Sequence, residues 1–211
     1  MPKLACADEV IGRLEGEYPA ARIALKYSSP LELLVATILS AQCTDETVNK
    51  VTPGLFARYH TAEDYATADR GRLEQEIKPT GFYHNKAGSI IGAARAIVAD
   101  YNGSVPRTMA ELIKLPGVGR KTANIVLYNA FGVIEGIAVD THVKRVSGRL
   151  GLTQNSDPEK IEKDLMGQVS KAKWGSFPYL LIEHGRAVCL ARKPKCQLCR
   201  LNDICPSAFK V

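Results

Sequence analysis

The sequence has 211 residues, of which 45% are hydrophobic, so the chain is long enough to bury one substantial core or two smaller ones. Its 28 Lys and Arg residues exceed its 22 Asp and Glu residues, and the resulting charge of +6 is compatible with a nucleic-acid partner. The N-terminus lacks the apolar run of a signal peptide, and no stretch approaches the roughly 18 apolar residues that a membrane helix needs. We therefore expect a soluble, cytoplasmic monomer with no membrane partner.

Helical signals follow one another along the chain and predict an all-α fold. Ser29, Thr44, Asp140 and Asp157 each stand where a helix N-cap is expected, directly before apolar residues that recur at helical spacing. Pro53 is predicted to begin a separate short turn of helix. Further apolar residues at this spacing predict helices at 10–14, 31–39, 55–59, 90–98, 143–150, 161–165 and 179–182. Only residues 133–139 have any strand character, and that segment is short.

Residues 115–123 read Leu-Pro-Gly-Val-Gly-Arg-Lys-Thr-Ala and predict a tight hairpin between two helices. Thr108 and Glu111 form a capping-box pattern that opens the first helix, and Pro116 is expected to end it. The backbone N–H groups at the start of the second helix, with the positive end of its dipole, can bind a phosphate oxygen. The pattern is not a P-loop, because Arg120 separates Gly119 from the lysine and no strand precedes it. An ordinary helix–turn–helix corner stays open on these residues alone.

Four of the six cysteines lie close together near the C-terminus, as Cys189-x6-Cys196-x2-Cys199-x5-Cys205. Such a group in an intracellular protein indicates a metal or a cluster rather than disulfides. The spacing matches neither the usual zinc pairs nor the ferredoxin run, and on spacing alone zinc and an iron–sulfur cluster both remain. The two other cysteines, at positions 6 and 43, are expected to act as small apolar side chains.

Four motifs together make the chain resemble the endonuclease III family of DNA glycosylases and abasic-site lyases. They are the segment 39–45 (Leu-Ser-Ala-Gln-Cys-Thr-Asp), the hairpin, the segment 139–143 (Val-Asp-Thr-His-Val) and the cysteine loop. The resemblance implies two lobes with a DNA cleft between them. One is a six-helix barrel of residues 23–133 that contains the helix–hairpin–helix at about 108–127. The other, formed by residues 1–22 and 134–211, carries a [4Fe–4S] cluster on the four cysteines.

The resemblance also implies the reaction. The family's lysine nucleophile corresponds to Lys121 and its catalytic aspartate to Asp140, and the enzyme excises damaged pyrimidines and then cuts the abasic site by β-elimination through a lysine Schiff base. The residues support this independently, because the first turn of a helix favours a neutral, nucleophilic amine and an N-cap holds a carboxylate rigidly. Read without the family, the same residues are a surface lysine and a plain N-cap.

Further residues correspond to DNA contacts of the family. The resemblance implies that the partner is double-stranded DNA containing damaged pyrimidines or abasic sites, and we expect the protein to be associated with the nucleoid. Gln42 is expected to fill the gap left by the flipped base. Phe82 stands where the family usually has a leucine wedge, and an aromatic ring can also insert between bases. The remaining predicted contacts are His142, the hairpin residues Leu115, Gly117, Val118, Gly119 and Thr122, and the basic residues Arg192, Lys193 and Lys195.

Three other functions fit parts of the sequence. The adenine glycosylases of the same superfamily share the hairpin, the aspartate and the cluster, but they usually lack a lysine at position 121. A non-catalytic DNA-binding module would need only the hairpin, and the pairing of Lys121 with Asp140 argues against it. A ferredoxin-like electron carrier is disfavoured by the cysteine spacing and the basic charge. An assay of abasic-site cleavage separates all of these.

Overall fold

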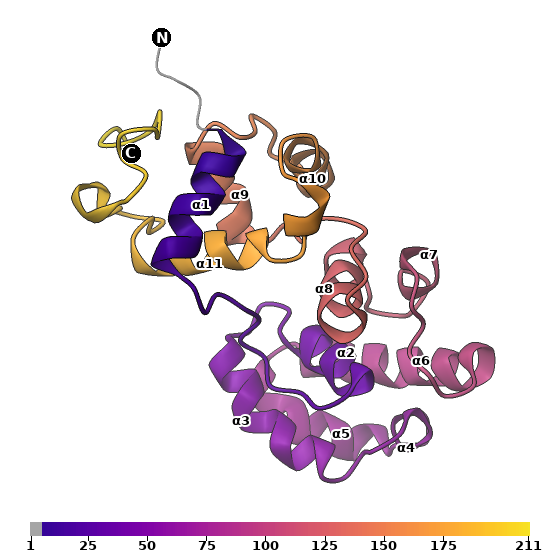
Figure 1. Cartoon of the computed structure of the whole chain (residues 1–211). Coiled ribbons are helices and arrows are strands. Elements are labelled where there is room, and N and C mark those ends of the chain that lie inside the picture. Colours follow the sequence, from indigo (N-terminus) through magenta and orange to yellow (C-terminus); the bar gives the residue numbers. More distant parts are fainter. Residues whose placement is uncertain (1–5) are drawn as a thin grey trace. The chain divides into compact units, whose positions relative to one another are not determined.

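The computed structural model describes residues 6–211, and in this range the chain is helical and contains no strand (Figure 1). The predicted all-α class is therefore confirmed, and residues 133–139 are an extended connection rather than a strand. The described part of the chain divides into two compact units. One is Ala24–Val133, and the other joins the N-terminal residues up to Ile23 to Ile134–Val211.

The first unit, Ala24–Val133, contains seven helices among its described residues. They are α2 (Pro30–Leu39), α3 (Asp45–Phe56), α4 (Ala62–Ala66), α5 (Arg70–Ile77), α6 (Tyr83–Tyr101), α7 (Met109–Leu112) and α8 (Arg120–Phe131), with a 3-10 turn at Lys78–Thr80. The long helix α6 packs against α4, α5 and α2, and α2 also packs against α8. The core between them consists of fully buried aliphatic side chains and Tyr65. This packing fixes α2, α6 and α8 relative to one another.

The second unit combines segments from both ends of the chain. Its helices are α1 (Ala7–Glu17), α9 (Thr141–Arg149), α10 (Pro158–Met166) and α11 (Phe177–Ala187), with 3-10 turns at Lys171–Lys173 and Cys196–Leu198. Helix α11 packs against α9 and α1, around a core that includes Leu14, Val143 and Phe177. The ion pair between Arg13 of α1 and Asp203, at 2.6 Å, attaches the C-terminal loop to the N-terminal helix.

The predicted N-caps form hydrogen bonds as expected. The side chain of Ser29 accepts from the N–H of Glu32, and Thr44 and Asp157 cap α3 and α10 in the same way. The prediction for Pro53 is wrong, because this proline lies inside α3. It stands in the last turn of α3, so any disturbance of the helix by its ring and its missing N–H is confined to the helix end. The first hairpin helix ends at Leu112 rather than at Pro116.

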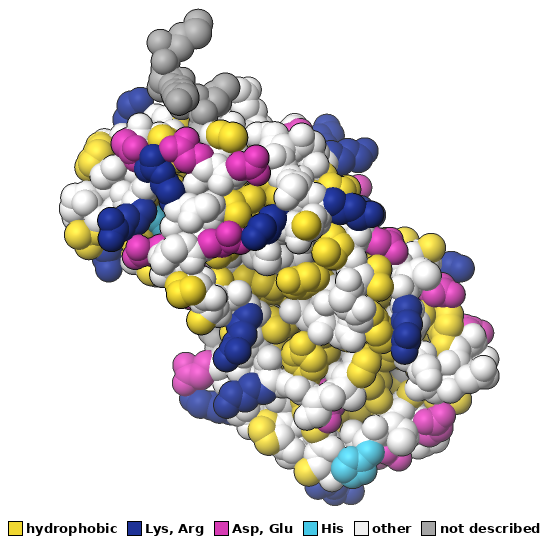
Figure 2. Space-filling model, viewed as in Figure 1, with side chains coloured by type: hydrophobic (Ala, Val, Ile, Leu, Met, Phe, Trp, Pro, Cys, Tyr) yellow, Lys and Arg dark blue, Asp and Glu magenta, His cyan; other side chains and the backbone are white. Residues whose placement is uncertain are grey.

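No helix in residues 6–211 combines the length and apolar character needed to cross a bilayer. On the face drawn in Figure 2, Lys and Arg side chains lie singly or in small groups among Asp and Glu side chains. This face therefore does not carry a continuous basic surface.

Candidate active site

The hairpin between α7 and α8 is built from local hydrogen bonds. Thr108 caps α7 by accepting from the N–H of Glu111 at 3.3 Å, and its hydroxyl donates to the Glu111 carboxylate at 2.7 Å. In the turn that follows, the N–H of Val118 donates to the carbonyl of Leu115 at 3.1 Å. The side chains of Leu115 and Val118 are buried, so they anchor the turn in the core. The groups of the turn that face outward are Pro116, the two glycines and the start of α8.

The two glycines of the hairpin differ in what a side chain at their position would meet. Gly117 has a φ of +77°, and a Cβ there would lie 2.5 Å from the Cβ of Ser89, so both conformation and space exclude a side chain. Gly119 is the N-cap of α8 and supplies no capping side chain, unlike the residues that cap α7 and α9. A Cβ on Gly119 would meet nothing within 4 Å. The start of α8 is therefore uncapped and open, which suits an external anion.

Lys121 and Thr122 lie in this first turn of α8, with Lys121 exposed and Thr122 half-buried. The predicted phosphate-binding N–H groups and the predicted nucleophile therefore both belong to the start of α8. The helix itself is held by Ala123, Val126 and Leu127, which are fully buried. A rigid helix end that carries an exposed lysine is a suitable position for a nucleophile.

Asp140 is the N-cap of α9. Its Oδ1 accepts from the N–H of Val143 at 2.7 Å, and its Oδ2 lies 3.2 Å from Nδ1 of His142. His142 in turn packs against α11, where a Cβ on Gly185 would come within 3.1 Å of its ring. The Asp140 side chain is 18% exposed, so the carboxylate is held on both oxygens but is still accessible.

A second group of predicted residues lies together in the first unit. Gln42, Phe82 and Gly117 line one open hollow of about 620 Å³, together with Asn85, Lys86 and Ser89. Gln42 and Phe82 are exposed, and both have left-handed backbone conformations, with φ of 51° and 48°. Non-glycine residues in this conformation are uncommon and cluster at functional sites.

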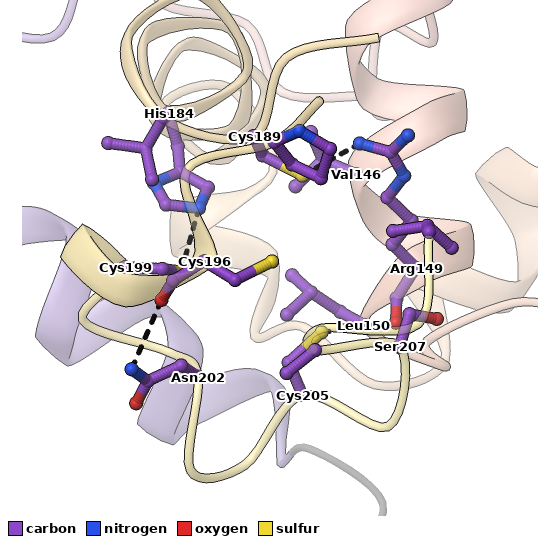
Figure 3. Close-up of a pocket in the computed structure, with 14 residues that line it drawn as sticks. Val146, Arg149, Leu150, His184, Cys189, Cys196, Cys199, Asn202, Cys205 and Ser207 are labelled. Atoms are coloured by element: carbon purple, nitrogen blue, oxygen red, sulfur yellow. Dashed lines mark hydrogen bonds between the residues drawn. The ribbon is translucent and has the colours of Figure 1, made fainter. Parts of the chain in front are cut away.

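The four cysteines of the C-terminal loop line a common pocket; they are Cys189, Cys196, Cys199 and Cys205. Figure 3 shows Cys196 and Cys205 directing their sulfur atoms into the central space. Within residues 6–211, no three Cys, His, Asp or Glu side chains converge closely enough to hold a single metal ion. A cavity lined by four separated thiols fits a polynuclear iron–sulfur cluster better than one zinc ion.

Hydrogen-bond donors lie beside two of these sulfur atoms, those of Cys189 and Cys199. Arg149 Nη1 donates to Cys189 Sγ at 3.4 Å (Figure 3), and the N–H of Leu201 donates to Cys199 Sγ at 3.4 Å. His184 Nε2 lies 3.4 Å from the same Cys199 sulfur. Burial raises the pKa of the Cys199 thiol, and the neighbouring cysteines raise it further. Four thiolates in this cavity therefore need a cationic group beside them, which the irons of a cluster supply.

Helix α9 links Asp140 to the cysteine loop within the second unit. Towards its other end, Arg149 donates to the carbonyl of Leu190 at 2.6 Å, and Arg145 donates to the carbonyl of Gly185 at 3.0 Å. These bonds fix the orientation of α9 against the segment that contains the first cysteine. The position of the Asp140 carboxylate therefore depends on the order of the cysteine loop.

The basic residues of this loop are accessible. Arg192, Lys193 and Lys195 are exposed, and none of them forms an ion pair with the described residues. Lys193 has a left-handed backbone with φ of 52°, which places it at a tight bend of the loop. Cations that lack acidic partners can meet phosphates without first breaking an ion pair.

Of the two other cysteines, Cys6 is exposed at the N-cap of α1, so the expectation of an apolar packing role is wrong for it. Its place at a helix start keeps its side chain outside the core. Cys43 is partly exposed, and its thiol lies 3.7 Å from the carbonyl of Thr44.

Comparison with known proteins decides the family. The model described as the HhH-GPD superfamily base excision DNA repair protein matches residues 35–171, and the iron-sulfur binding domain of endonuclease III matches residues 189–205. Endonuclease III of Synechocystis is 55% identical over 96% of this chain and 92% of its own length, and that of Escherichia coli K12 is 41% identical over 96% of each. The chain belongs to the endonuclease III family. A solved structure of a trapped endonuclease III–DNA covalent intermediate, 44% identical, matches 95% of this chain and 94% of that one with a TM-score of 0.91.

Membership confirms the predicted activity and cofactor. The chain is a base excision DNA repair glycosylase of the endonuclease III type, which acts on damaged pyrimidines. Its enzyme class is DNA glycosylase and abasic-site lyase. Its iron–sulfur domain begins at Cys189 and ends at Cys205, so it spans all four cysteines of the loop, and the cofactor is a [4Fe–4S] cluster. The rival functions of an electron carrier and of a non-catalytic module are thereby excluded.

Some residues of the site were not predicted from the sequence. Lys86, Asn85 and Ser89 line the same hollow as Gln42, and Arg149 and His184 contact the cysteine sulfurs. The partners of the last two are far away in the sequence, so no local pattern marks them. The family resemblance marks Phe82 as a DNA contact, but nothing in the sequence around it indicates that Lys86 is buried.

We expect the purified protein to be brown and to contain about four irons per chain. The variant Cys199→Ser should lose the cluster absorbance and unfold at a lower temperature, because the loop would lose one of the four thiolate ligands of the cluster that holds it together. Iron analysis, visible absorbance and thermal unfolding measure these effects. The control Cys43→Ser, outside the cysteine loop, should leave all three unchanged. Stoichiometric zinc in anaerobically prepared wild-type protein, without visible absorbance, would contradict the prediction.

Proposed function

We propose that this chain binds double-stranded DNA at damaged pyrimidines and abasic sites, largely without reading sequence. The uncapped start of α8 would accept one phosphate on its backbone N–H groups, and the exposed Arg192, Lys193 and Lys195 would meet others. Contacts of this kind position a protein on the duplex but carry no sequence information. We further propose that the protein acts as a monomer on chromosomal DNA at the nucleoid.

The proposed nucleophile is the amine of Lys121. Once a damaged pyrimidine is rotated out of the duplex, this nitrogen forms a bond to C1′ of the deoxyribose while the bond from C1′ to the base breaks. Opening of the sugar gives a Schiff base between Lys121 and C1′. The Schiff base acidifies the C2′ proton, and its removal expels the 3′ phosphate oxygen by β-elimination. Water then releases the lysine.

Asp140 supplies the second catalytic group in this proposal. Its carboxylate is held by the N–H of Val143 and by His142, so it is fixed before substrate arrives. A fixed negative charge stabilises the cationic character that develops on the sugar as the base leaves. The same carboxylate can accept the proton that the Lys121 ammonium must lose before its neutral amine attacks. In this proposal His142 holds the Asp140 carboxylate in place and also contacts the DNA.

Gln42 and Phe82 are proposed to fill the space from which the base is extruded. Support comes from their exposure, their left-handed backbones and their place on one hollow. A glutamine can hydrogen-bond the unpaired opposite base, and a ring can stack where the base was. The four cysteines ligate the cluster, whose proposed work is to hold the basic loop and the end of α9 in place.

The observation that carries the proposal is the exposed Lys121 in the uncapped first turn of α8, next to the phosphate-binding turn. Incubation of the wild-type protein with a duplex that contains an abasic site, in the presence of borohydride, should give a covalent protein–DNA adduct. Without borohydride the strand should be cut on the 3′ side. If the protein excised a damaged pyrimidine but left the strand uncut and untrapped, a monofunctional mechanism like that of the adenine glycosylases would replace this one.

The open N-cap of α8 allows a direct test of the proposed phosphate binding at this helix start. The variant Gly119→Asp should cap α8 without strain and raise protein stability slightly, by about a few tenths of a kcal/mol. The same carboxylate should repel a phosphate and weaken DNA binding by about tenfold or more. The neutral variant Gly119→Asn caps equally well and should bind DNA better than Gly119→Asp. Thermal unfolding and fluorescence anisotropy measure the two effects, and unchanged affinity of Gly119→Asp would show that no phosphate binds there.

A further inference from the structure

Lys86 is the one lysine in residues 6–211 whose side chain is buried, with 5% of its surface exposed. Its ammonium donates to the carbonyl of Leu39 at 2.8 Å and to the carbonyl of Thr80 at 2.7 Å. Burying an ammonium costs free energy unless its donors are satisfied, and burial lowers the pKa of Lys86 accordingly. A lysine kept in such a place has a function that an apolar side chain of the same size would not supply.

The two carbonyls belong to the segments that present Gln42 and Phe82. Leu39 is the last residue of α2, three positions before Gln42, and Thr80 ends the 3-10 turn, two positions before Phe82. Both carbonyls lie at the negative ends of helical segments, which favour a cation. Lys86 therefore ties the ends of these two loops together by direct hydrogen bonds.

Both loops are in backbone conformations that need support. Gln42 and Phe82 have φ of 51° and 48°, and Gly81 between Thr80 and Phe82 has φ of 70°. Such conformations are strained for non-glycine residues and persist when surrounding bonds enforce them. Lys86 lines the same hollow as these residues and makes the two bonds that hold the loop ends.

We propose that Lys86 is a positioning residue for base extrusion, whose ammonium holds the ends of the two loops so that Gln42 and Phe82 can together occupy the gap in the duplex. This inference rests on the proposed roles of Gln42 and Phe82. Lys86 is not a second nucleophile, because an ammonium that donates two hydrogen bonds has no lone pair to attack with. Its effect is confined to the step in which a paired base leaves the stack.

The experiment compares two substrates with one variant, Lys86→Met, which keeps the volume of the side chain and removes its donors. Single-turnover excision of a damaged pyrimidine paired in a duplex should slow by about tenfold or more, since misplacement by about 1 Å can cost up to two orders of magnitude. Cleavage of a pre-formed abasic site should change less than excision, because no base has to leave the stack. The control Lys50→Met, at an exposed lysine of α3, should change neither rate.

A double-mutant cycle separates positioning from general stability. In a Gln42→Ala/Phe82→Ala background, Lys86→Met should cause no further loss of excision. Thermal unfolding and iron content show that each variant is folded, and Lys86→Gln, which keeps a donor on a shorter side chain, replaces Lys86→Met if the latter does not fold. Equal loss in both reactions, or an undiminished loss in the Gln42→Ala/Phe82→Ala background, would overturn the inference. Failure of the wild-type protein to cut or trap an abasic site would instead overturn the proposed lyase mechanism.

Discussion

Replacement of Lys121 by glutamine is expected to abolish borohydride trapping and to lower abasic-site cleavage by about four orders of magnitude or more, because the reaction then lacks its nucleophile. Binding to abasic DNA should persist, since the backbone N–H groups of the α8 start and the basic loop are unchanged. Lys121 is exposed in the first turn of its helix, so the substitution removes no buried contact and should leave the unfolding temperature close to that of the wild-type protein. Trapping, gel-based cleavage and anisotropy measure the three properties.

A matched control is available in α10. Lys160 is also an exposed lysine in the first turn of a helix, and Lys160→Gln should leave trapping, cleavage and binding unchanged. Persistent trapping by Lys121→Gln would show that a different amine attacks the sugar. Loss of binding together with loss of cleavage would show that Lys121 acts mainly as a phosphate contact.

The parts of the fold that the sequence predicted are those with a local cause. Ser29, Thr44, Asp140 and Asp157 cap helices because a short polar side chain meets backbone N–H groups two or three residues away. The cysteine spacing could be interpreted because ligation of a cluster demands that residue type. The all-α class follows from the apolar spacing of nearly every segment.

Helices α4 and α5 were not predicted, although their starts can be recognised. Thr61 and Asp64 form a capping box for α4, but with Asp where the pattern usually has Glu or Gln. Helix α5 is polar and contains Gly71 near its start, so its apolar spacing is weak. Both short helices are stabilised by packing against α6, which is a tertiary effect that a local pattern does not contain.

The candidate site likewise contains residues that local motifs predict and residues that only the fold reveals. Lys121 and Asp140 lie in motifs and could be named from the sequence, but the burial of Lys86 could not. Its bond to Leu39 spans 47 positions, and a lysine in a polar turn is ordinarily exposed. The left-handed backbones of Gln42 and Phe82 were not predicted either. Motifs therefore indicate candidate reacting residues, and the fold adds the residues that hold them.

Replacement of Asp140 by asparagine is expected to slow base excision by roughly two to four orders of magnitude while leaving the fold intact. Asparagine caps a helix as well as aspartate does, so the bond from the N–H of Val143, at 2.7 Å, keeps an acceptor. The negative charge beside His142 is lost, and with it the stabilisation of the cationic sugar. Single-turnover excision and thermal unfolding measure the two consequences.

The matched control for Asp140→Asn is Asp157→Asn, at a cap of α10 that accepts from the N–H groups of Glu159 and Lys160 at 3.1 Å. Both variants should have unfolding temperatures close to that of the wild-type protein, but only Asp140→Asn should lose excision. Cleavage of a pre-formed abasic site should suffer less in Asp140→Asn, because the aldehyde of that substrate is already electrophilic and needs no help in expelling a base. If Asp140→Asn lowered stability and both reactions together, Asp140 would be a helix cap alone, and the charge that assists departure of the base would have to come from another residue.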